Sequence, residues 1–325
     1  MSFKTPVLFL IFNQPEITIK TFSKIARIKP TTLYISADGP RKGCSEEEEC
    51  ELTRSKVLSM INWDCDVHKR FLSKNVGCKE AVSTGISWFL EEQKEGIILE
   101  YDCVPSQSFF YFCEKMLSRY RDDVRIFSIS GTNYQFGKSY GDGDYYYSRI
   151  PSVWGWATWE RAWKHWDGSI SNYPESKKMN VVESYFKCKK TIKFWNKKFL
   201  QIYNNLDDTW GLPWVFAVFK NNGLCVSPNK NLITNIGFSK KATHAKDLND
   251  VHSNLKRFEL ENFVSPSIMV PVQDADEKFS RDLSLEPINV IVMHGIRYVL
   301  GTVLPKRVYF FLRRLFRKYF RGINE

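Results

Sequence analysis

The first 130 residues alternate short apolar runs with segments whose apolar side chains recur at helical spacing. The runs are short and continuous, which suits strands buried on both faces of a sheet. Strands separated by helices of this length form right-handed crossovers and a parallel sheet. The sequence therefore predicts an α/β fold. The expected strands are residues 7–12, 33–37, 67–72 and 96–99, and the expected helices begin near Ile17, Glu46, Lys79 and Phe109.

The pattern is less regular beyond Gly131. Residues 134–147 are rich in Gly, Asp and Tyr, which predicts a long functional loop, with the tyrosines 145–147 in a lid that orders when a ligand binds. Trp159, Trp163 and Trp166 have helical spacing and are expected in the core. A basic helical surface is expected at residues 187–193, a buried helix at 209–221 and a short strand from Leu224.

Charge is distributed unevenly along the 325 residues. Lys and Arg number 47 and Asp and Glu 36, so the net charge is +11, which suggests an anionic partner. Residues 287–325 contain eight basic residues and one acidic residue, Glu325, and so carry +7, while the other 286 residues carry +4. A nucleic-acid-binding protein would spread its charge over a face of the folded core. The distribution therefore disfavours nucleic acid as the partner.

The C-terminal segment combines this charge with apolar residues. Beyond Pro305, aromatic and aliphatic residues alternate with basic ones, which is typical of an amphipathic helix on an anionic membrane surface. The alternative is a helix packed on the rest of the protein with a solvated basic edge. Residues 288–304 are apolar, but His294 and Arg297 interrupt them and the stretch is shorter than a usual membrane span.

Features of the N-terminus and the cysteines predict a reducing compartment. The apolar run that ends at Asn13 is too short for a membrane span and lacks a signal-peptide cleavage site. The eight cysteines form no Cys-x-x-Cys pair, so a zinc ribbon or a thioredoxin-type site is disfavoured. We expect free thiols in a cytoplasmic protein that associates peripherally with the inner face of the cytoplasmic membrane through residues 287–325.

Polar side chains follow each expected strand of the first half. Ligands of open α/β sheets bind at the carboxyl ends of the strands, so these side chains are candidates for one site. Glu100 and Asp102 are two apart and could approach one Mg²⁺ or Mn²⁺ ion beyond a buried strand. Their alternative role is to cap the helix that follows Pro105. The other residues at strand ends are Asn13, Asp38, Asn75 and Gly77, of which Asp38-Gly39 is also a common turn and Asn75-x-Gly77 a common helix cap.

Three common nucleotide or hydrolase motifs do not occur. The sequence contains no Gly-x-Gly-x-x-Gly, no Gly-x-x-x-x-Gly-Lys and no Gly-x-Ser-x-Gly. Dehydrogenase, P-loop and α/β-hydrolase activities are therefore disfavoured.

Seven motifs occur in order between Pro6 and Asp247, and together they resemble the GT-A nucleotide-diphospho-sugar transferases. More narrowly, the chain is similar to bacterial glycosyltransferase 2-like (haemolytic-protein-like) proteins, which are related in pattern to N-acetylglucosaminyltransferase I. The motifs are PVLFLIFNQP (6–15), YISADGPR (34–41), NVGCK (75–79), ILEYDCVP (98–105), WGWATW (154–159), DDTW (207–210) and NIGF (235–238) with ATH (242–244).

The resemblance implies a fold and an activity. The fold would be Rossmann-like, with a mostly parallel sheet flanked by helices and a C-terminal amphipathic helical extension. The activity would be metal-dependent, inverting transfer from a UDP-sugar to a glycan or lipid-linked acceptor in bacterial surface-polysaccharide biosynthesis (lipopolysaccharide, capsule or O-antigen), with Mn²⁺ or Mg²⁺. The expected parts are a catalytic domain at 1–250 (nucleotide-binding half 1–131, acceptor half 132–250), a linker or packing segment at 251–286 and the tail at 287–325; a homodimer is possible.

The resemblance also assigns roles to matching residues. Glu100-Tyr101-Asp102 resembles the family's Glu-Asp-Asp version of the DxD motif, in which Asp102 would bind the metal and Glu100 the ribose or sugar. Asp38 would accept a hydrogen bond from uracil. The other implied nucleotide-sugar contacts are Asn13, Gln14, Arg41, Asn75, Gly77, Lys79, Tyr101, Trp154, Gly155 and Trp156.

Two residues depart from the family pattern. Tyr101 replaces an acidic residue, so the site has one fewer negative charge, and Gln14 stands where such families often have Arg. Weaker contacts to metal or phosphate are expected at these positions, for which Arg41 could compensate.

The inverting reaction needs a carboxylate to accept the proton of the attacking hydroxyl. The resemblance places this base in the DDTW motif, where we favour Asp208 narrowly over Asp207; the alternative is that both acids cap the helix containing Trp210. His244 would complete the metal or diphosphate site, or serve only a structural role. Two other functions stay open: a nucleotidyltransferase, which usually has a Gly- and Lys-rich loop near its N-terminus, and a degenerate, non-catalytic binding protein.

Overall fold

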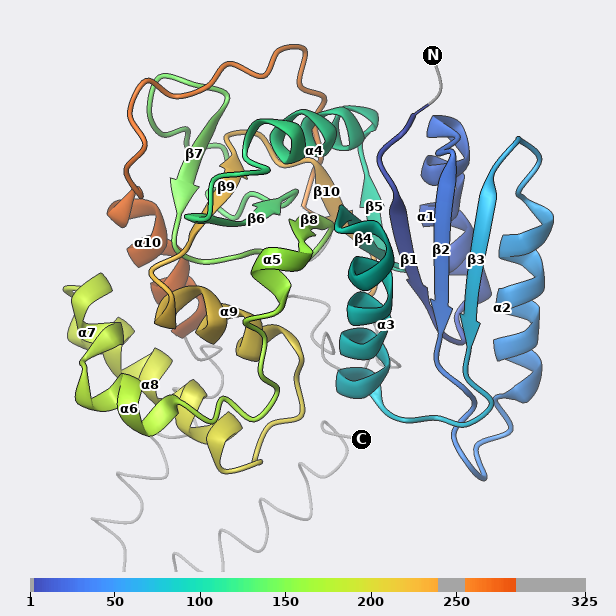
Figure 1. Ribbon diagram of the computed structural model, residues 1–325, viewed down its shortest axis with the longest axis horizontal. Coiled ribbons are helices and arrows are strands. Elements are labelled where there is room, and N and C mark those ends of the chain that lie inside the picture. Colours follow the sequence, from blue (N-terminus) through green and yellow to red (C-terminus); the bar gives the residue numbers. More distant parts are fainter. Residues whose placement is uncertain (1–2, 239–254, 285–325) are drawn as a thin grey trace, which may run out of the picture. The chain divides into compact units, whose positions relative to one another are not determined.

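The computed structural model describes residues 3–238 and 255–284, and the chain divides into two compact units, Met1–Ser280 and Arg281–Glu325. An eight-stranded sheet forms the centre of the first unit, in the order β3-β2-β1-β4-β8-β6-β9-β7 (Figure 1). The expected tail at 287–325 and His244 lie outside the described residues.

The first four strands are parallel neighbours and match the expected ones. They are β1 (Val7–Ile11), β2 (Thr32–Ala37), β3 (Asp66–Phe71) and β4 (Glu95–Glu100). The helices between them are α1 (Pro15–Ile28), α2 (Glu47–Ser59) and α3 (Cys78–Gln93). This arrangement confirms the predicted α/β fold with a mostly parallel sheet.

The second half of the sheet is mixed. Strand β8 (Trp156–Trp159) is antiparallel to both β4 and β6 (Ile126–Ser130), whereas β9 (Leu224–Pro228) is parallel to β6. Strand β7 (Tyr145–Ser148) is antiparallel to β9 at the edge. A separate antiparallel pair joins β5 (Cys103–Pro105) to β10 (Ile233–Asn235).

Apolar side chains of alternating strand positions build a core on each face of the sheet. Phe9 and Ile35 point to the face covered by α1, α2 and α4 (Gln107–Arg119). Leu10 and Tyr34 point to the opposite face, which α3, α5 (Glu160–Trp163) and α9 (Gly211–Lys220) cover.

Beyond α9 lies a third, helical cluster. It consists of α6 (Tyr173–Lys178), α7 (Val181–Tyr185) and α8 (Lys189–Tyr203), which pack against α9 through a core that includes Trp195, Phe199 and Phe216 (Figure 1). The final described helix, α10 (Gln273–Ser284), contacts this cluster through Ser280, which accepts a hydrogen bond from the Trp195 indole nitrogen at 2.9 Å.

The predicted lid at the tyrosines 145–147 is wrong. All three residues lie in β7 and are buried, and the Tyr120 hydroxyl is 2.6 Å from that of Tyr145 and 2.7 Å from that of Tyr147. The aromatic run was interpreted as a mobile loop because Gly and Asp precede it. Its β-forming tyrosines instead fit the edge of the sheet.

Candidate functional site

The acidic motif lies where β4 ends. Glu100 is the last residue of β4, and Tyr101 and Asp102 form the turn that leads into β5. The NIGF motif covers this turn from the other side, because the Ile236 amide donates to the Asp102 carbonyl at 2.9 Å. A β-carbon at Gly237 would lie 1.9 Å from Asp102 Oδ2, so glycine is needed for this close approach.

Burial of the two carboxyl groups changes their acidity. The pKa of Glu100 is raised by burial and by the neighbouring charge of Asp102. Burial also raises the pKa of Asp102, although the hydrogen bond from the Cys103 thiol at 3.4 Å opposes this shift. Like charges that are shielded from water favour binding of a proton or a cation between them.

A further carboxylate approaches this pair across the site. The Cys78 thiol, at the start of α3, has its pKa raised to about 12, first by burial and then by the charges of Glu100, Asp208, Asp102 and Asp38. We call these four acids, which act on one thiol, the carboxylate cluster. The structure therefore brings together residues from four distant motifs that the sequence analysis selected.

The two candidate bases differ in their surroundings. Asp208 is exposed and contributes to the field around Cys78. Asp207 is half-buried and lies 3.9 Å from the Lys198 ammonium group of α8. Of the two, only Asp208 is among the charges that raise the pKa of Cys78.

Asp38 joins the loops that follow β2 and β3. Its carboxylate accepts hydrogen bonds from the Asn75 amide group at 2.9 Å, the Val76 backbone at 3.0 Å and the Gly39 backbone at 2.8 Å. Burial raises the pKa of Asp38, while these bonds counteract the shift. Gly77 caps α3 with a φ of 88°, a conformation that favours glycine.

Glu46 was not selected from the sequence, yet it connects two residues that were. Its carboxylate accepts from the Asn13 amide group at 3.1 Å and forms an ion pair with Arg41 at 2.9 Å. Arg41 also lies over the Phe12 ring at 5.2 Å. The Glu46 carboxylate therefore balances the charge of the Arg41 guanidinium group. The only sequence signal for this role was the acidic run at the start of α2.

The two departures from the family pattern contact each other. Gln14, which precedes α1, donates from Nε2 to the Tyr101 hydroxyl at 3.0 Å. The pKa of Tyr101 is raised by burial and by the charges of Asp102 and Glu100, so its phenol stays protonated. The pair is thus neutral and places a hydroxyl beside the acids.

The tryptophan motif has only one residue positioned to face a ligand. Trp154 is half-buried and packs edge-on against Phe238, next to the glycine that contacts Asp102. Trp156 is fully buried and stacks on Trp210 at 5.9 Å, so its expected pocket role is wrong in this structure. Gly155 permits close packing with Ile233 rather than with a sugar.

Lys79 and Trp166 lie on the α3 side of the site. The Lys79 stem is next to Gly168, where a β-carbon would be 3.1 Å from its Cε. Trp166 donates from its indole nitrogen to the Trp210 carbonyl at 3.1 Å and stacks on Trp163. Trp159 and Trp163 are buried, as their spacing predicted, but Trp159 ends a strand instead of lying in a helix.

Within the described ranges 3–238 and 255–284, no group of three or more His, Cys, Asp or Glu side chains could hold a metal ion, and no helix is long and apolar enough to cross a membrane. The predicted ligand His244 is outside these ranges. Glu100 and Asp102 fit a divalent cation in their chemistry, since both are oxygen donors with raised pKa values.

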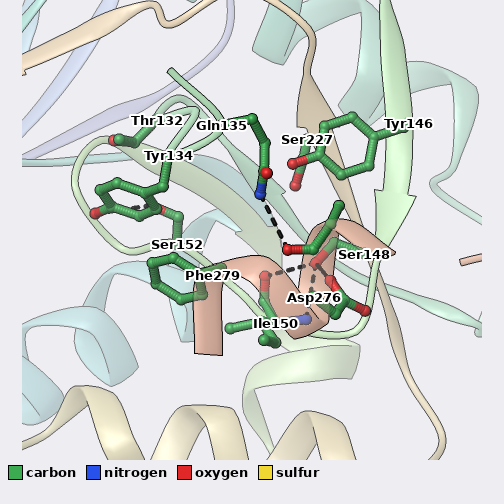
Figure 2. A pocket seen from close by; sticks show the side chains of 11 residues that line it. Thr132, Tyr134, Gln135, Tyr146, Ser148, Ile150, Ser152, Ser227, Asp276 and Phe279 are labelled. Atoms are coloured by element: carbon green, nitrogen blue, oxygen red, sulfur yellow. Dashed lines mark hydrogen bonds between the residues drawn. The ribbon is translucent and has the colours of Figure 1, made fainter. Parts of the chain in front are cut away.

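A small pocket lies elsewhere in the first unit, between the loop after β6, strands β7 and β9, and α10 (Figure 2). It is lined mainly by hydroxyl-bearing side chains. Its acid, Asp276, is buried and accepts from the Ser148 hydroxyl at 2.5 Å and from the Arg149 backbone at 3.0 Å. Burial raises the pKa of Asp276 to about 7.

No protein-family model and no curated protein matches the chain. Among solved structures, the chain is similar to a 4-diphosphocytidyl-2C-methyl-D-erythritol synthase from Anaerococcus prevotii DSM 20548, with 8% identity and a TM-score of 0.31 over 67% of this chain and 98% of that chain. It is also similar to a UDP-glucose pyrophosphorylase complexed with UDP-glucose, with 9% identity and a TM-score of 0.33 over 69% of this chain and 90% of that chain.

Proposed function

We propose that this protein is a metal-dependent, inverting glycosyltransferase that uses a UDP-sugar. The observation that carries the proposal is the carboxylate cluster, in which Glu100, Asp102, Asp38 and Asp208 all act on the Cys78 thiol. The four acids come from three motifs of the resemblance and Cys78 from a fourth, and they are separated by up to 170 positions in the sequence. Asp38 and the Glu100–Asp102 pair follow the carboxyl ends of β2 and β4, the edge at which open α/β sheets bind ligands, and this supports a nucleotide-sugar site there.

The acid pair would hold Mn²⁺ or Mg²⁺. Asp102 and Glu100 supply oxygen ligands, and a bound cation would relieve the repulsion that raises their pKa values. Such an ion neutralises the charge of a departing nucleoside diphosphate.

Asp208 would accept the proton of the acceptor hydroxyl. It is exposed, so an acceptor can reach it, and no ion pair with a described residue neutralises it. Asp207 is instead paired with the Lys198 ammonium group at 3.9 Å. The role of Asp208 requires an ionised carboxylate beside the acceptor hydroxyl.

The uridine would lie at the loops after β2 and β3. Asp38 already accepts three hydrogen bonds there, and Asn75 is held within the same network. Gln14, Tyr101 and the Asn13–Glu46–Arg41 group surround the neighbouring end of β1. Trp154 would face the sugar, because it packs beside Phe238 at the edge of the acid pair.

The connection after β1 favours a glycosyltransferase over a nucleotidyltransferase. Strand β1 ends at Ile11 and α1 begins at Pro15, so only three residues, Phe12, Asn13 and Gln14, connect them. This segment contains neither Gly nor Lys. A long Gly- and Lys-rich nucleotide loop has no room at this position.

The acceptor would be a glycan or a lipid-linked saccharide of bacterial surface-polysaccharide assembly, handled at the inner face of the cytoplasmic membrane. The support for this part is the resemblance together with the +7 charge of residues 287–325.

A thermal-unfolding titration with a panel of nucleotide sugars, with and without Mn²⁺, tests the function. We expect one UDP-sugar to raise the melting temperature only in the presence of Mn²⁺, because bound ligand stabilises the native state by RT ln(1 + [L]/Kd). Asp102→Ala should remove this Mn²⁺-dependent rise.

Two outcomes would contradict the proposal. Stabilisation by a nucleoside triphosphate, together with release of pyrophosphate from that triphosphate when a sugar phosphate is added, would indicate a nucleotidyltransferase. Binding of a UDP-sugar that Mn²⁺ and Asp102→Ala leave unchanged would mean that the acid pair is not the metal site.

A further inference from the structure

Helix α8 has one buried face and one exposed face. Its buried residues are Thr191, Trp195, Phe199 and Ile202, which recur at intervals of three or four and pack toward α9. Helices α6 and α7 cover the neighbouring sides of α8 (Figure 1). One stripe of α8 therefore faces solvent.

The exposed stripe is strongly basic. Between Lys187 and Tyr203 the chain has six lysines and no acidic residue. On a helix of 3.6 residues per turn, four of these lysines and one leucine share the side opposite the buried residues. We call this set the α8 basic face; its members, all exposed, are Lys189, Lys190, Lys193, Lys197 and Leu200.

The acidic side chain bound to the start of α8 is engaged by other groups, since the Glu277 carboxylate accepts from the Lys187 backbone at 2.6 Å and from the Thr191 hydroxyl at 3.0 Å. Among the residues that the structure describes, none of the four lysines of the α8 basic face forms an ion pair, whereas the adjacent Lys198 lies 3.9 Å from Asp207. Grouped like charges without partners destabilise the isolated protein by mutual repulsion and favour contact with an anionic surface.

Apolar side chains extend this face at its C-terminal end. Leu200 is 46% exposed, Tyr203 41% and Leu206, in the following loop, 73%. Exposed leucines beside lysines do not assist the reading of phosphates or bases in nucleic acid, where aromatic stacking and charge dominate. They do suit insertion into the headgroup region of a bilayer.

The same segment leads directly to the proposed base. Leu206 precedes Asp208 by two residues, and the Lys198–Asp207 ion pair attaches this loop to α8. A surface that contacts the α8 basic face would thus lie next to Asp208. This position suits an acceptor whose lipid part remains in the membrane.

We propose that the α8 basic face docks the first unit onto an anionic lipid bilayer, independently of residues 287–325. The lysines supply the attraction to acidic headgroups, and Leu200, Tyr203 and Leu206 enter the interface. Docking does not depend on the glycosyltransferase activity, since lipid binding needs neither donor nor metal.

Vesicle sedimentation of the full chain tests this surface. The vesicles contain phosphatidylcholine alone or with phosphatidylglycerol as about a third of the lipid. Replacing Lys189, Lys190, Lys193 and Lys197 with Gln should weaken binding to the anionic vesicles by up to about fivefold for each lysine. The matched control replaces four exposed lysines of the nucleotide-binding half, Lys20, Lys29, Lys42 and Lys69, with Gln and should bind as the wild type does.

A second pair of variants separates this face from the tail. Replacing Arg313, Arg314, Arg317 and Lys318 with Gln should leave a residual affinity for the anionic vesicles. Adding the α8 substitutions to this variant should remove that residual affinity. Leu206→Ser should lower binding further without changing net charge. Equal vesicle binding by the α8 variant and the control variant would overturn the proposal. The same holds if the α8 substitutions weaken binding of the protein to RNA but not to the vesicles. The rise in melting temperature with a UDP-sugar is measured in parallel. A protein that shows this rise but no α8-dependent vesicle binding contradicts the docking face alone, whereas a protein without the rise contradicts the proposed function.

Discussion

Burial raises the pKa of carboxyl groups in two regions of this protein, and the two regions differ in the residues that surround those groups. In the carboxylate cluster, Glu100 and Asp102 have raised pKa values, and Asp38 and Asp208 add negative charge around the same thiol. In the pocket of Figure 2, Asp276 is the acid that lines it, and a serine hydroxyl and a backbone amide bind it. Burial raises the pKa in both regions.

The difference indicates what each region does. Asp276 ties α10 to β7: its own hydrogen bonds satisfy it, and the Gln135 amide group adds a bond to the Ala275 carbonyl at 3.1 Å. Among the described residues, no donor comparable to these binds the Glu100 carboxylate, and the charge of Asp102 adds to the effect of burial on its pKa. A raised pKa alone therefore does not identify a functional site; the neighbouring charges do.

The largest expected effect comes from removing the proposed base. Asp208→Asn should lower kcat by about 10²–10⁴-fold, because general-base catalysis contributes about this factor. The binding of the UDP-sugar should stay within a few-fold of wild type, since Asp208 faces the acceptor. Steady-state kinetics with a donor identified by the thermal-unfolding titration measures both quantities.

Asp207→Asn and Asp276→Asn are the matched controls for this experiment. Each removes one negative charge, Asp207→Asn beside Lys198 and Asp276→Asn in the pocket of Figure 2. Both should keep kcat within about fivefold of wild type. If Asp207→Asn were the variant that lost activity, the assignment of the base would be reversed.

The next effect concerns stability. The pKa of Asp276 is about 7 in the folded protein against an ordinary value of 3.8, so the folded state binds the proton more tightly than the unfolded state. The stabilisation from this proton is complete below about pH 4 and is lost as the pH rises to about 7. The loss is about 4 kcal/mol, at ~1.4 kcal/mol for each pKa unit.

Asp276→Asn removes this titration and isolates the effect. Its free energy of unfolding relative to wild type should rise by about 4 kcal/mol between pH 4 and pH 7.5, as measured by urea unfolding at several pH values. A difference that stays constant over this range would mean that Asp276 is already ionised at pH 4 in the folded protein.

Much of the fold of residues 3–131 could be predicted from the sequence. β1 is apolar throughout, β4 is apolar from Ile97 to Leu99, and the helix signals are local, such as Pro15 at the start of α1 and the acids of α2. The acids at strand ends could be proposed because parallel strands place them at one edge of the sheet.

The rest depends on contacts between distant residues. Nothing local shows that Glu46 accepts from Asn13, that Gly237 packs on Asp102 or that Trp156 faces the core between α5 and α9. The β7 tyrosines form a strand because β9 offers them a partner, which a Gly- and Asp-rich neighbourhood conceals. Long-range packing thus overrode local composition at these positions.

The smallest expected effect tests whether the two departures from the family pattern act as one unit. The Gln14–Tyr101 hydrogen bond places a neutral hydroxyl next to the carboxylate cluster. In the pocket of Figure 2, by contrast, the Ser148 hydroxyl donates directly to the acid, Asp276. Tyr101→Phe should weaken UDP-sugar binding by about 0.5–1.5 kcal/mol, the usual contribution of one hydrogen bond. Gln14→Ala should cost a similar amount, and the double variant should lose little more than either single one, as a double-mutant cycle by calorimetry would measure. Additive losses would mean that each side chain contacts the donor separately.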